Sequence, residues 1–299
     1  MNSSASAKTI LFGEHAVVYG EPAIAIPLPN LRTYAEIRPD NNEFRIISEN
    51  TGLNKPYNDL DPASGIKQLI DLLISELQLD ELPHATLMIR SDIPIASGLG
   101  SGAAVSVAVI REFARYFEKN LSSGKINEIA FEIEKIYHGF PSGIDNTTIT
   151  YETPIIFSKS GGFTKLSADV TKLPLLIVDS GIRSRTVDAV TDVRNNYENN
   201  KNYLHQIGLL VQKAERELEE GNLEEIGMLM NENQRLLAQI GVSCEKIDQY
   251  ISIAEDNRAL GSKITGAGRG GNFLVLAQNR EQACELKKLY ENIGLRVFL

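Results

Sequence analysis

Several residue types are scarce in this chain of 299 residues, and each scarcity excludes a class of protein. The two cysteines, Cys244 and Cys284, form no CxxC pair, so the chain is no disulfide scaffold, and reduced, buried thiols are expected. The four histidines are scattered without HExxH or zinc-finger spacing, which argues against a transition-metal site. The low cysteine content therefore indicates a reducing compartment.

Long apolar runs and a surplus of basic charge are also missing. No run approaches the roughly 18 apolar residues of a membrane helix, and the N-terminus lacks the pattern of a signal peptide. The 39 acidic and 30 basic side chains give a net charge of −9, which repels nucleic-acid phosphates at long range. We therefore expect a cytoplasmic protein with no membrane or nucleic-acid partner, although a small anion could still bind where backbone N–H groups converge.

The chain has enough apolar residues, 42%, to bury a core, and their patterning indicates an α+β protein. A strand-rich half precedes a helix-rich half, which predicts two domains, residues 1–170 and 171–299. Strands are expected at residues 8–12, 23–28 and 31–38, an irregular loop at 50–62 and one helical stretch at 186–218. Residues 105–117 are apolar on several faces, which predicts a deeply buried helix.

The segment PIASGLGSGAA, residues 94–104, is the strongest of three glycine-rich segments. Small residues let the backbone approach a bulky anion, and the segment leads into a helix whose first N–H groups are unpaired. Such a helix start attracts phosphate, although a tight turn before a packed helix would need the same residues. The segment is no Walker loop, because GxxxxGK[ST] is absent, and the HRD and DFG signatures of protein kinases are missing too.

Charged residues accompany the other two glycine-rich segments. Glu134 lies near a predicted helix end, and Asp145 follows a turn at residues 138–144. The two carboxylates could bind magnesium and act as a base, or they could be solvated turn residues. Lys8 lies in an apolar strand, either reaching solvent or serving as a catalytic cation. Residues 263–271, KITGAGRGG, contain GxGxxG but start no long helix, so a dinucleotide fold is not indicated.

In this order, these segments resemble the motifs of the GHMP small-molecule kinases. Residues 94–104 are similar to the family motif P-x-(S/A)-(S/A)-G-L-G-S-S-A-A. Residues 13–20 (GEHAVVYG) behind Lys8, residues 138–146 (HGFPSGIDN) and residues 263–268 (KITGAG) resemble the members that phosphorylate mevalonate. The motifs span residues 8–271, and four ordered motifs are far more specific than any one.

The resemblance implies an N-terminal domain like the ribosomal-protein-S5 fold, a ferredoxin-like C-terminal domain and an active site in the cleft between them. It implies an enzyme that uses ATP and Mg²⁺ to phosphorylate the 5-hydroxyl of mevalonate in isoprenoid biosynthesis. Asp145 then matches the catalytic base, Lys8 the catalytic cation and Glu134 a metal ligand. The implied ATP-binding residues are Pro94, Ile95, Ala96, Ser97, Gly98, Leu99, Gly100, Ser101, Gly102, Ala103 and Ala104.

The implied substrate-binding residues are Glu14, His15, Thr186, Gly266, Ala267 and Gly268. One departure concerns the metal, because the family often has two serines after Gly-Leu-Gly and here the pair is Ser101-Gly102. Glycine supplies no hydroxyl, so Ser101 or water would have to complete the magnesium shell.

Three alternatives stay open at this point. The acceptor could be homoserine, a sugar such as galactose or a mevalonate derivative. The chain could also be a non-catalytic ATP-binding sensor, since a fold does not fix a function. Such a sensor would have lost its base or cation, whereas Lys8, Glu134 and Asp145 are all present. Finally, the sequence does not distinguish a monomer from a homodimer.

Overall fold

The computed structural model describes residues 3–95, 97–138, 141–183 and 186–298. These residues form two compact units, each discontinuous in sequence. The first unit covers the described residues within 3–8, 27–95 and 100–152, and the second covers the rest. Residue 170, where we expect the domain boundary, lies inside the second unit, so the division at that residue stays a prediction.

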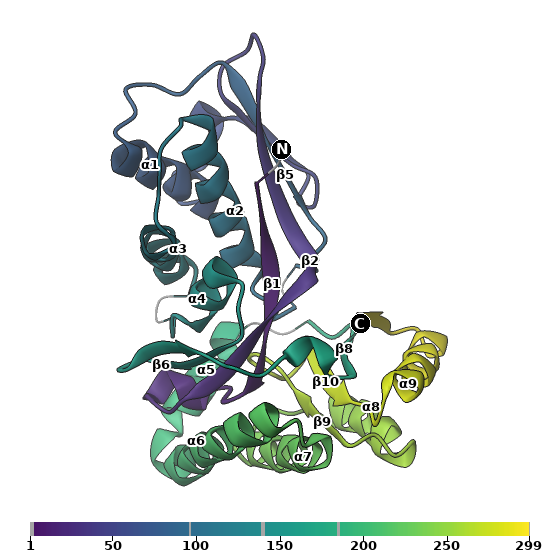
Figure 1. Ribbon diagram of the computed structural model, residues 1–299. Coiled ribbons are helices and arrows are strands. Elements are labelled where there is room, and N and C mark those ends of the chain that lie inside the picture. Colours follow the sequence, from purple (N-terminus) through teal and green to yellow (C-terminus); the bar gives the residue numbers. More distant parts are fainter. Residues whose placement is uncertain (1–2, 96, 139–140, 184–185, 299) are drawn as a thin grey trace. The chain divides into compact units, whose positions relative to one another are not determined.

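The first unit is a sheet with helices on one side (Figure 1). Its strands run in the order β4 (Leu53–Pro56), β3 (Arg45–Ser48), β5 (Ala85–Ser91) and β2 (Ala23–Pro39), and β1 (Ser3–Phe12) pairs with β2. β3 and β5 are parallel, whereas β3–β4 and β2–β5 are antiparallel. The helices are α1 (Gly65–Leu77), α2 (Ser101–Tyr116), α3 (Ser123–His138) and α4 (Ile144–Tyr151).

Helix α2 is the centre of this unit, because it contacts α1, α3, α4 and β5. Val107, Ala108, Val109 and Ile110 are all fully enclosed, so successive residues are buried all round the helix. The predicted buried helix is thus confirmed, and it begins four residues earlier than expected. Its early start places Ser101 and Gly102 in the first helical turn.

Two long strands, β1 and β2, have residues in both units. Residues 23–25 of β2 pair with β6 (Ile155–Ser158), and residues 33–39 pair with β5. The sequence predicts two separate strands here, at residues 23–28 and 31–38, and that prediction is wrong because β2 is continuous. Pro27 and Pro29 lie between the two paired stretches, where neither β5 nor β6 requires their missing N–H group.

The second unit contains an antiparallel sheet in the order β11-β8-β10-β9. Its strands are β8 (Leu175–Asp179), β9 (Gly261–Ile264), β10 (Asn272–Leu276) and β11 (Arg296–Phe298). The helices of this unit are α5 (Thr186–Asn195), α6 (Tyr197–Glu220), α7 (Leu223–Gln239), α8 (Glu245–Asp256) and α9 (Arg280–Asn292). The hairpin of β6 and β7 (Gly162–Lys165) and the 3₁₀ turns η1 (Ala16–Tyr19) and η3 (Val170–Lys172) complete it.

Helix α7 packs unusually closely on strand β9 because both carry a glycine at the contact. A Cβ on Gly227 would lie 2.5 Å from the Leu260 carbonyl oxygen, and one on Gly261 would lie 2.2 Å from the Gly227 oxygen. This approach lets two side-chain amides of α7 reach the outer backbone of β9. The Asn231 side chain accepts from Ser262 N at 2.9 Å, and the Gln234 side chain accepts from Ile264 N at 2.9 Å.

Other differences from the predicted elements have local causes. The expected loop at residues 50–62 contains β4 and the 3₁₀ turn η2 (Tyr57–Asp59), because Gly52 with a φ of +69° closes a hairpin with β3. The expected helix over 186–218 is two helices, since Asn196 is non-helical and its side chain donates to the Asp192 carbonyl at 2.9 Å. Both cysteines are free, but Cys244 is half-buried and Cys284 exposed, so their predicted burial is wrong.

Candidate active site

Lys8 is the buried cation of the first unit. It lies on β1, only 2% of the residue is exposed, and its Nζ is 3.0 Å from Asp145 Oδ1. Gly100 makes room for the lysine stem, because a Cβ there would lie 3.1 Å from Lys8 Cε and 2.8 Å from Ile149 Cδ1. Gly100 also has a φ of +74°, so both space and backbone conformation require glycine before α2.

Asp145 lies in the first turn of α4, where the sequence predicts only a turn. The short helix is rich in threonine, and the hydroxyls of Thr147 and Thr148 donate to carbonyls four residues earlier at 2.6 and 2.7 Å. The first turn of the helix thus directs the Asp145 side chain toward the Lys8 ammonium, 3.0 Å away. The side chain is 31% exposed, so a small molecule can reach it.

Glu134 lies on α3 with 3% of the residue exposed. Burial raises its pKa to about 8, the negative charge of Asp145 adds to the effect, and Lys8 opposes it. A Cβ at Gly102 would lie 3.6 Å from Glu134 Oε1, so this carboxylate faces the first turn of α2. Lys8, Asp145 and Glu134 therefore form one charged cluster beside the start of that helix.

The glycine-rich segment reaches this helix start through two glycines with left-handed backbone, Gly98 and Gly100. The first intrahelical hydrogen bond runs from Ala104 N to Gly100 O at 2.9 Å, so the N–H groups of residues 101–103 precede it. Residues 97–99 belong to the second unit, where the Asn272 side chain donates to Ser97 O at 2.6 Å. Of the predicted ATP-binding residues, Ala96 lies outside the described residues.

A second cluster lies within the second unit, around the turn after β1. Lys263 donates to the carboxylate of Glu14, and both side chains are fully enclosed. Lys263 Nζ also donates to the Ile264 carbonyl oxygen at 2.7 Å. Burial lowers the pKa of Lys263, although the carboxylate of Glu14 opposes that shift.

His15 is the neighbour of Glu14, and its Nε2 lies 2.9 Å from the Ala267 carbonyl oxygen. Burial lowers the His15 pKa to about 4, the bond to Ala267 works against this, and the charge of Arg269 lowers it further. His15 is therefore neutral near pH 7, and because it bonds a carbonyl through Nε2, that nitrogen carries the proton.

The remaining predicted substrate-binding residues are the turn at residues 266–268 and Thr186. Gly266 and Gly268 have φ values of +77° and form a tight turn with Ala267, and a Cβ on Gly266 would lie 3.5 Å from Gly98 Cα. Thr186 begins α5, but its side chain lies outside the described residues.

Three further residues of the second cluster were not identified from the sequence: Lys263, Thr265 and Asn272. The Thr265 hydroxyl donates to Ile10 O at 2.9 Å and lies 2.9 Å from the Thr9 hydroxyl. Lys263 and Thr265 lie inside a segment that resembles a family motif, so the motif itself was the available signal. Nothing in the local pattern around Asn272 indicates its role.

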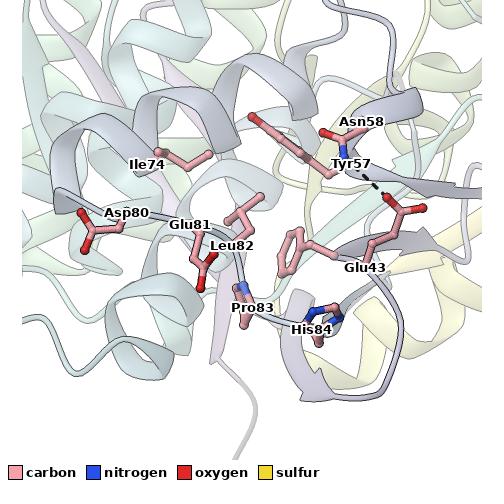
Figure 2. A pocket seen from close by; sticks show the side chains of 10 residues that line it. Glu43, Tyr57, Asn58, Ile74, Asp80, Glu81, Leu82, Pro83 and His84 are labelled. Carbon is pink, nitrogen blue, oxygen red and sulfur yellow. Dashed lines mark hydrogen bonds between the residues drawn. The ribbon is translucent and has the colours of Figure 1, made fainter.

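A pocket elsewhere in the first unit does not suit a nucleotide. It has a volume of about 390 Å³, and Figure 2 shows the carboxylates of Glu43, Asp80 and Glu81 around it. These charges would repel a triphosphate, and the lining residues include none of the predicted site residues.

Two features are absent from the described residues. No group of three or more His, Cys, Asp or Glu side chains is placed to hold a metal ion among them. No helix in the same part of the chain is long and apolar enough to cross a membrane.

Comparison with known proteins agrees with the resemblance read from the motifs. The family model for the GHMP kinases N terminal domain matches residues 64–153, and that for the GHMP kinases C terminal matches residues 214–290. The mevalonate kinase of Thermococcus sibiricus is 33% identical over 304 residues, covering 93% of this chain and 90% of that one.

Solved structures are similar over nearly the whole chain. The Methanococcus jannaschii mevalonate kinase has a TM-score of 0.88 at 28% identity, covering 100% of this chain and 96% of that one. The L. major mevalonate kinase in complex with R-mevalonate has a TM-score of 0.81 at 29% identity, covering 97% of this chain and 91% of that one. The chain belongs to the GHMP kinase family and, within it, to the mevalonate kinases.

Proposed function

We propose that this enzyme transfers the γ-phosphoryl group of ATP to the 5-hydroxyl of mevalonate, giving 5-phosphomevalonate and ADP for isoprenoid biosynthesis in the cytoplasm. The observation that carries the proposal is the ion pair of the buried Lys8 with the accessible Asp145, 3.0 Å apart, beside a helix start suited to phosphate. The curated relatives and the neighbour with bound R-mevalonate support mevalonate as the acceptor.

Phosphoryl transfer requires positioned groups and charge stabilisation more than covalent catalysis by the protein. In the proposed mechanism the Asp145 carboxylate orients the acceptor hydroxyl and takes its proton as the new P–O bond forms. The Lys8 ammonium stabilises negative charge on the attacking oxygen and on the transferring group. The bond from the γ-phosphorus to the bridging oxygen breaks, and ADP leaves with that oxygen.

The phosphates of ATP would bind at the segment from Pro94 to Ala104. The N–H groups of residues 101–103 and the positive end of the α2 dipole are the donors that this proposal uses. These groups explain how a chain with a net charge of −9 can bind a polyanion.

The donor set near the start of α2 fits Mg²⁺. Glu134 and Ser101 offer hard oxygen atoms, and Mg²⁺ is commonly bound by one or two carboxylates together with water and substrate phosphates. When bound, the ion would neutralise phosphate charge. Burial and the negative charge of Asp145 raise the pKa of Glu134 to about 8, which is consistent with a carboxylate that becomes charged when a cation binds.

For the acceptor we propose His15, Thr186 and the Gly266–Gly268 turn as contacts, with Glu14 beside them. Another acceptor, such as homoserine or galactose, is the alternative to test, and a homodimer is a second open point. A coupled assay of ADP release with a panel of acceptor alcohols decides the first point. We expect turnover with R-mevalonate only, and equal turnover with homoserine or galactose would contradict the proposal.

The Asp145→Asn variant tests the mechanism directly. It keeps the size of the side chain but removes the base, so we expect turnover to fall about 10²–10⁴-fold. ATP binding, measured by calorimetry, should stay within about twofold, because Asp145 contacts the acceptor in this mechanism. Retention of most of the wild-type turnover would contradict the role of Asp145.

A further inference from the structure

Three contacts join the end of β1 and the turn after it to the end of β9 and the turn that follows, all within the second unit. Lys263 contacts Glu14, Thr265 contacts Ile10, and Ala267 contacts His15. Lys263 lies in strand β9, whereas Ala267 lies in the tight turn between Gly266 and Gly268, so the contacts involve both the strand and the turn. Two of them join neighbouring residues, Glu14 and His15, so the position of one affects the other.

The Lys263–Glu14 contact is the one that holds charged groups away from water. Both side chains have no exposed surface, so each would be strongly disfavoured there without the other. The ammonium is bound on a second side by the Ile264 carbonyl oxygen at 2.7 Å, which fixes its place against β9. The carboxylate of Glu14 is therefore held at a defined point, enclosed by the protein and turned away from solvent.

The backbone beside Glu14 needs such an anchor. Gly13 has a φ of +98°, and a Cβ there would lie 2.5 Å from Ala23. His15 has a φ of +59°, which is uncommon for a residue with a side chain and persists only where the surroundings hold it. Glu14 lies between these two residues, and its own carbonyl accepts from Ala16 N at 2.6 Å.

We propose that Lys263 is a positioning residue for acceptor binding, which holds Glu14 and so keeps the His15 ring against the Ala267 turn. Glu14 then acts through this pair and not by touching the acceptor, because its carboxylate is enclosed. The inference deepens the proposed function and rests on it. It assigns to the buried lysine of the KITGAG segment a role in selecting where the acceptor sits.

Two variants and one control test the role. Lys263→Met removes the ammonium at similar length, and we expect the KM for mevalonate to rise roughly tenfold or more while the KM for ATP changes by less than about threefold. The double variant Lys263→Gln with Glu14→Gln replaces the charged pair by two amides that can still bond each other. It should restore the KM for mevalonate to within about threefold of wild type.

The control is Arg115→Met in the first unit. It takes an arginine from another fully enclosed carboxylate, Glu112, which is outside the proposed site. We expect it to lower the melting temperature without changing either KM. If Lys263→Met raises both KM values equally, or neither, the positioning role is wrong. A double variant as defective as the single one would show that the Glu14 charge itself is needed, which also contradicts the proposal.

Backbone hydrogen exchange keeps the test valid if Lys263→Met folds poorly or if mevalonate is no substrate. In the folded double variant the amides of Ala16 and Val17, bonded to the carbonyls of Glu14 and Gly13, should exchange at about the wild-type rate. The single variant, measured at low temperature, should exchange both amides faster. Normal protection in the single variant contradicts the anchor, whereas absence of mevalonate turnover in wild type contradicts only the proposed function.

Discussion

At the scale of single residues, the burial of Glu134 costs stability that the proposed metal ion would restore. Its pKa of about 8 lies above the ordinary value of 4.5, so between these pH values the folded protein keeps a proton that the unfolded chain releases. The folded state therefore loses stability as pH rises through this window. A cation bound beside Glu134 would remove the penalty, since it favours the charged carboxylate.

The Glu134→Gln variant tests this sign. It stays neutral at every pH, so its stability relative to wild type should increase from pH 5 to pH 8, by at most about 1.4 kcal/mol per pH unit for one proton. Denaturant unfolding without Mg²⁺ measures the difference. Glu132 is an exposed residue on the same helix, and the stability of Glu132→Gln should change with pH as that of wild type does. The Mg²⁺ requirement of turnover should rise in Glu134→Gln and not in Glu132→Gln.

Gly102 gives a second prediction at this scale. Its backbone is ordinary helix, and a Cβ there would lie 3.6 Å from Glu134 Oε1, so Gly102→Ser fits without a clash. The added hydroxyl should lower the Mg²⁺ concentration that gives half-maximal turnover. Gly102→Ala, which adds the Cβ alone, is the matched control and should leave that concentration unchanged. Equal Mg²⁺ titrations for the two variants would argue against a ligand position at this residue.

The sequence could predict part of the candidate site, and the limit is physical. Lys8, Glu134 and Asp145 were predicted as one cluster through motif resemblance, and the structure brings the three together. Lys263 was not predicted to pair with Glu14, because 249 residues separate them and no local period encodes a contact of that range. The burial of Glu14, which changes its interpretation, likewise depends on tertiary packing.

At the scale of elements, the contact of α7 with β9 depends on glycine. Gly227→Ala would place a Cβ 2.5 Å from a backbone oxygen that no side-chain rotation can move, so we expect a loss of about 1–3 kcal/mol in the free energy of unfolding. Gly124→Ala in α3 is the control, because its Cβ would meet only ordinary contacts at 3.8 Å. It should be neutral or stabilise by up to about 1 kcal/mol. Equal free energies of unfolding in urea for Gly227→Ala and Gly124→Ala would contradict the close contact.

Long periodic elements were predicted well and short ones poorly. The apolar spacing predicts helices over residues 223–239 and 245–255, and α7 and α8 begin at those residues because the spacing extends over several turns. The sequence predicts a turn where helix α4 carries Asp145, since eight residues with five threonine or isoleucine side chains carry little periodic signal. The structure of such short elements is decided by neighbours, here α2 and α3, that lie elsewhere in the sequence.

At the scale of the whole molecule, ligand binding and stability are linked. ATP with Mg²⁺ at about 100 times its Kd should stabilise the folded chain by about 2.7 kcal/mol, which appears as a higher melting temperature. Gly98→Ala forces alanine into a left-handed backbone in the proposed phosphate segment, and Gly52→Ala does the same in the β3–β4 turn. Both variants should have a lower melting temperature than wild type. Only Gly98→Ala should lose most of the increase in melting temperature that ATP produces.

The two side-chain amides on β9 have a consequence for how this protein behaves at high concentration. Strand β9 is an outer strand of its sheet, and such strands offer unpaired backbone groups to a neighbouring chain. Asn231 and Gln234 occupy those groups, and the opposite outer strand, β11, has only three residues. The outer edge of β9 is thereby closed to the sheet of another molecule, which disfavours edge-to-edge aggregation there.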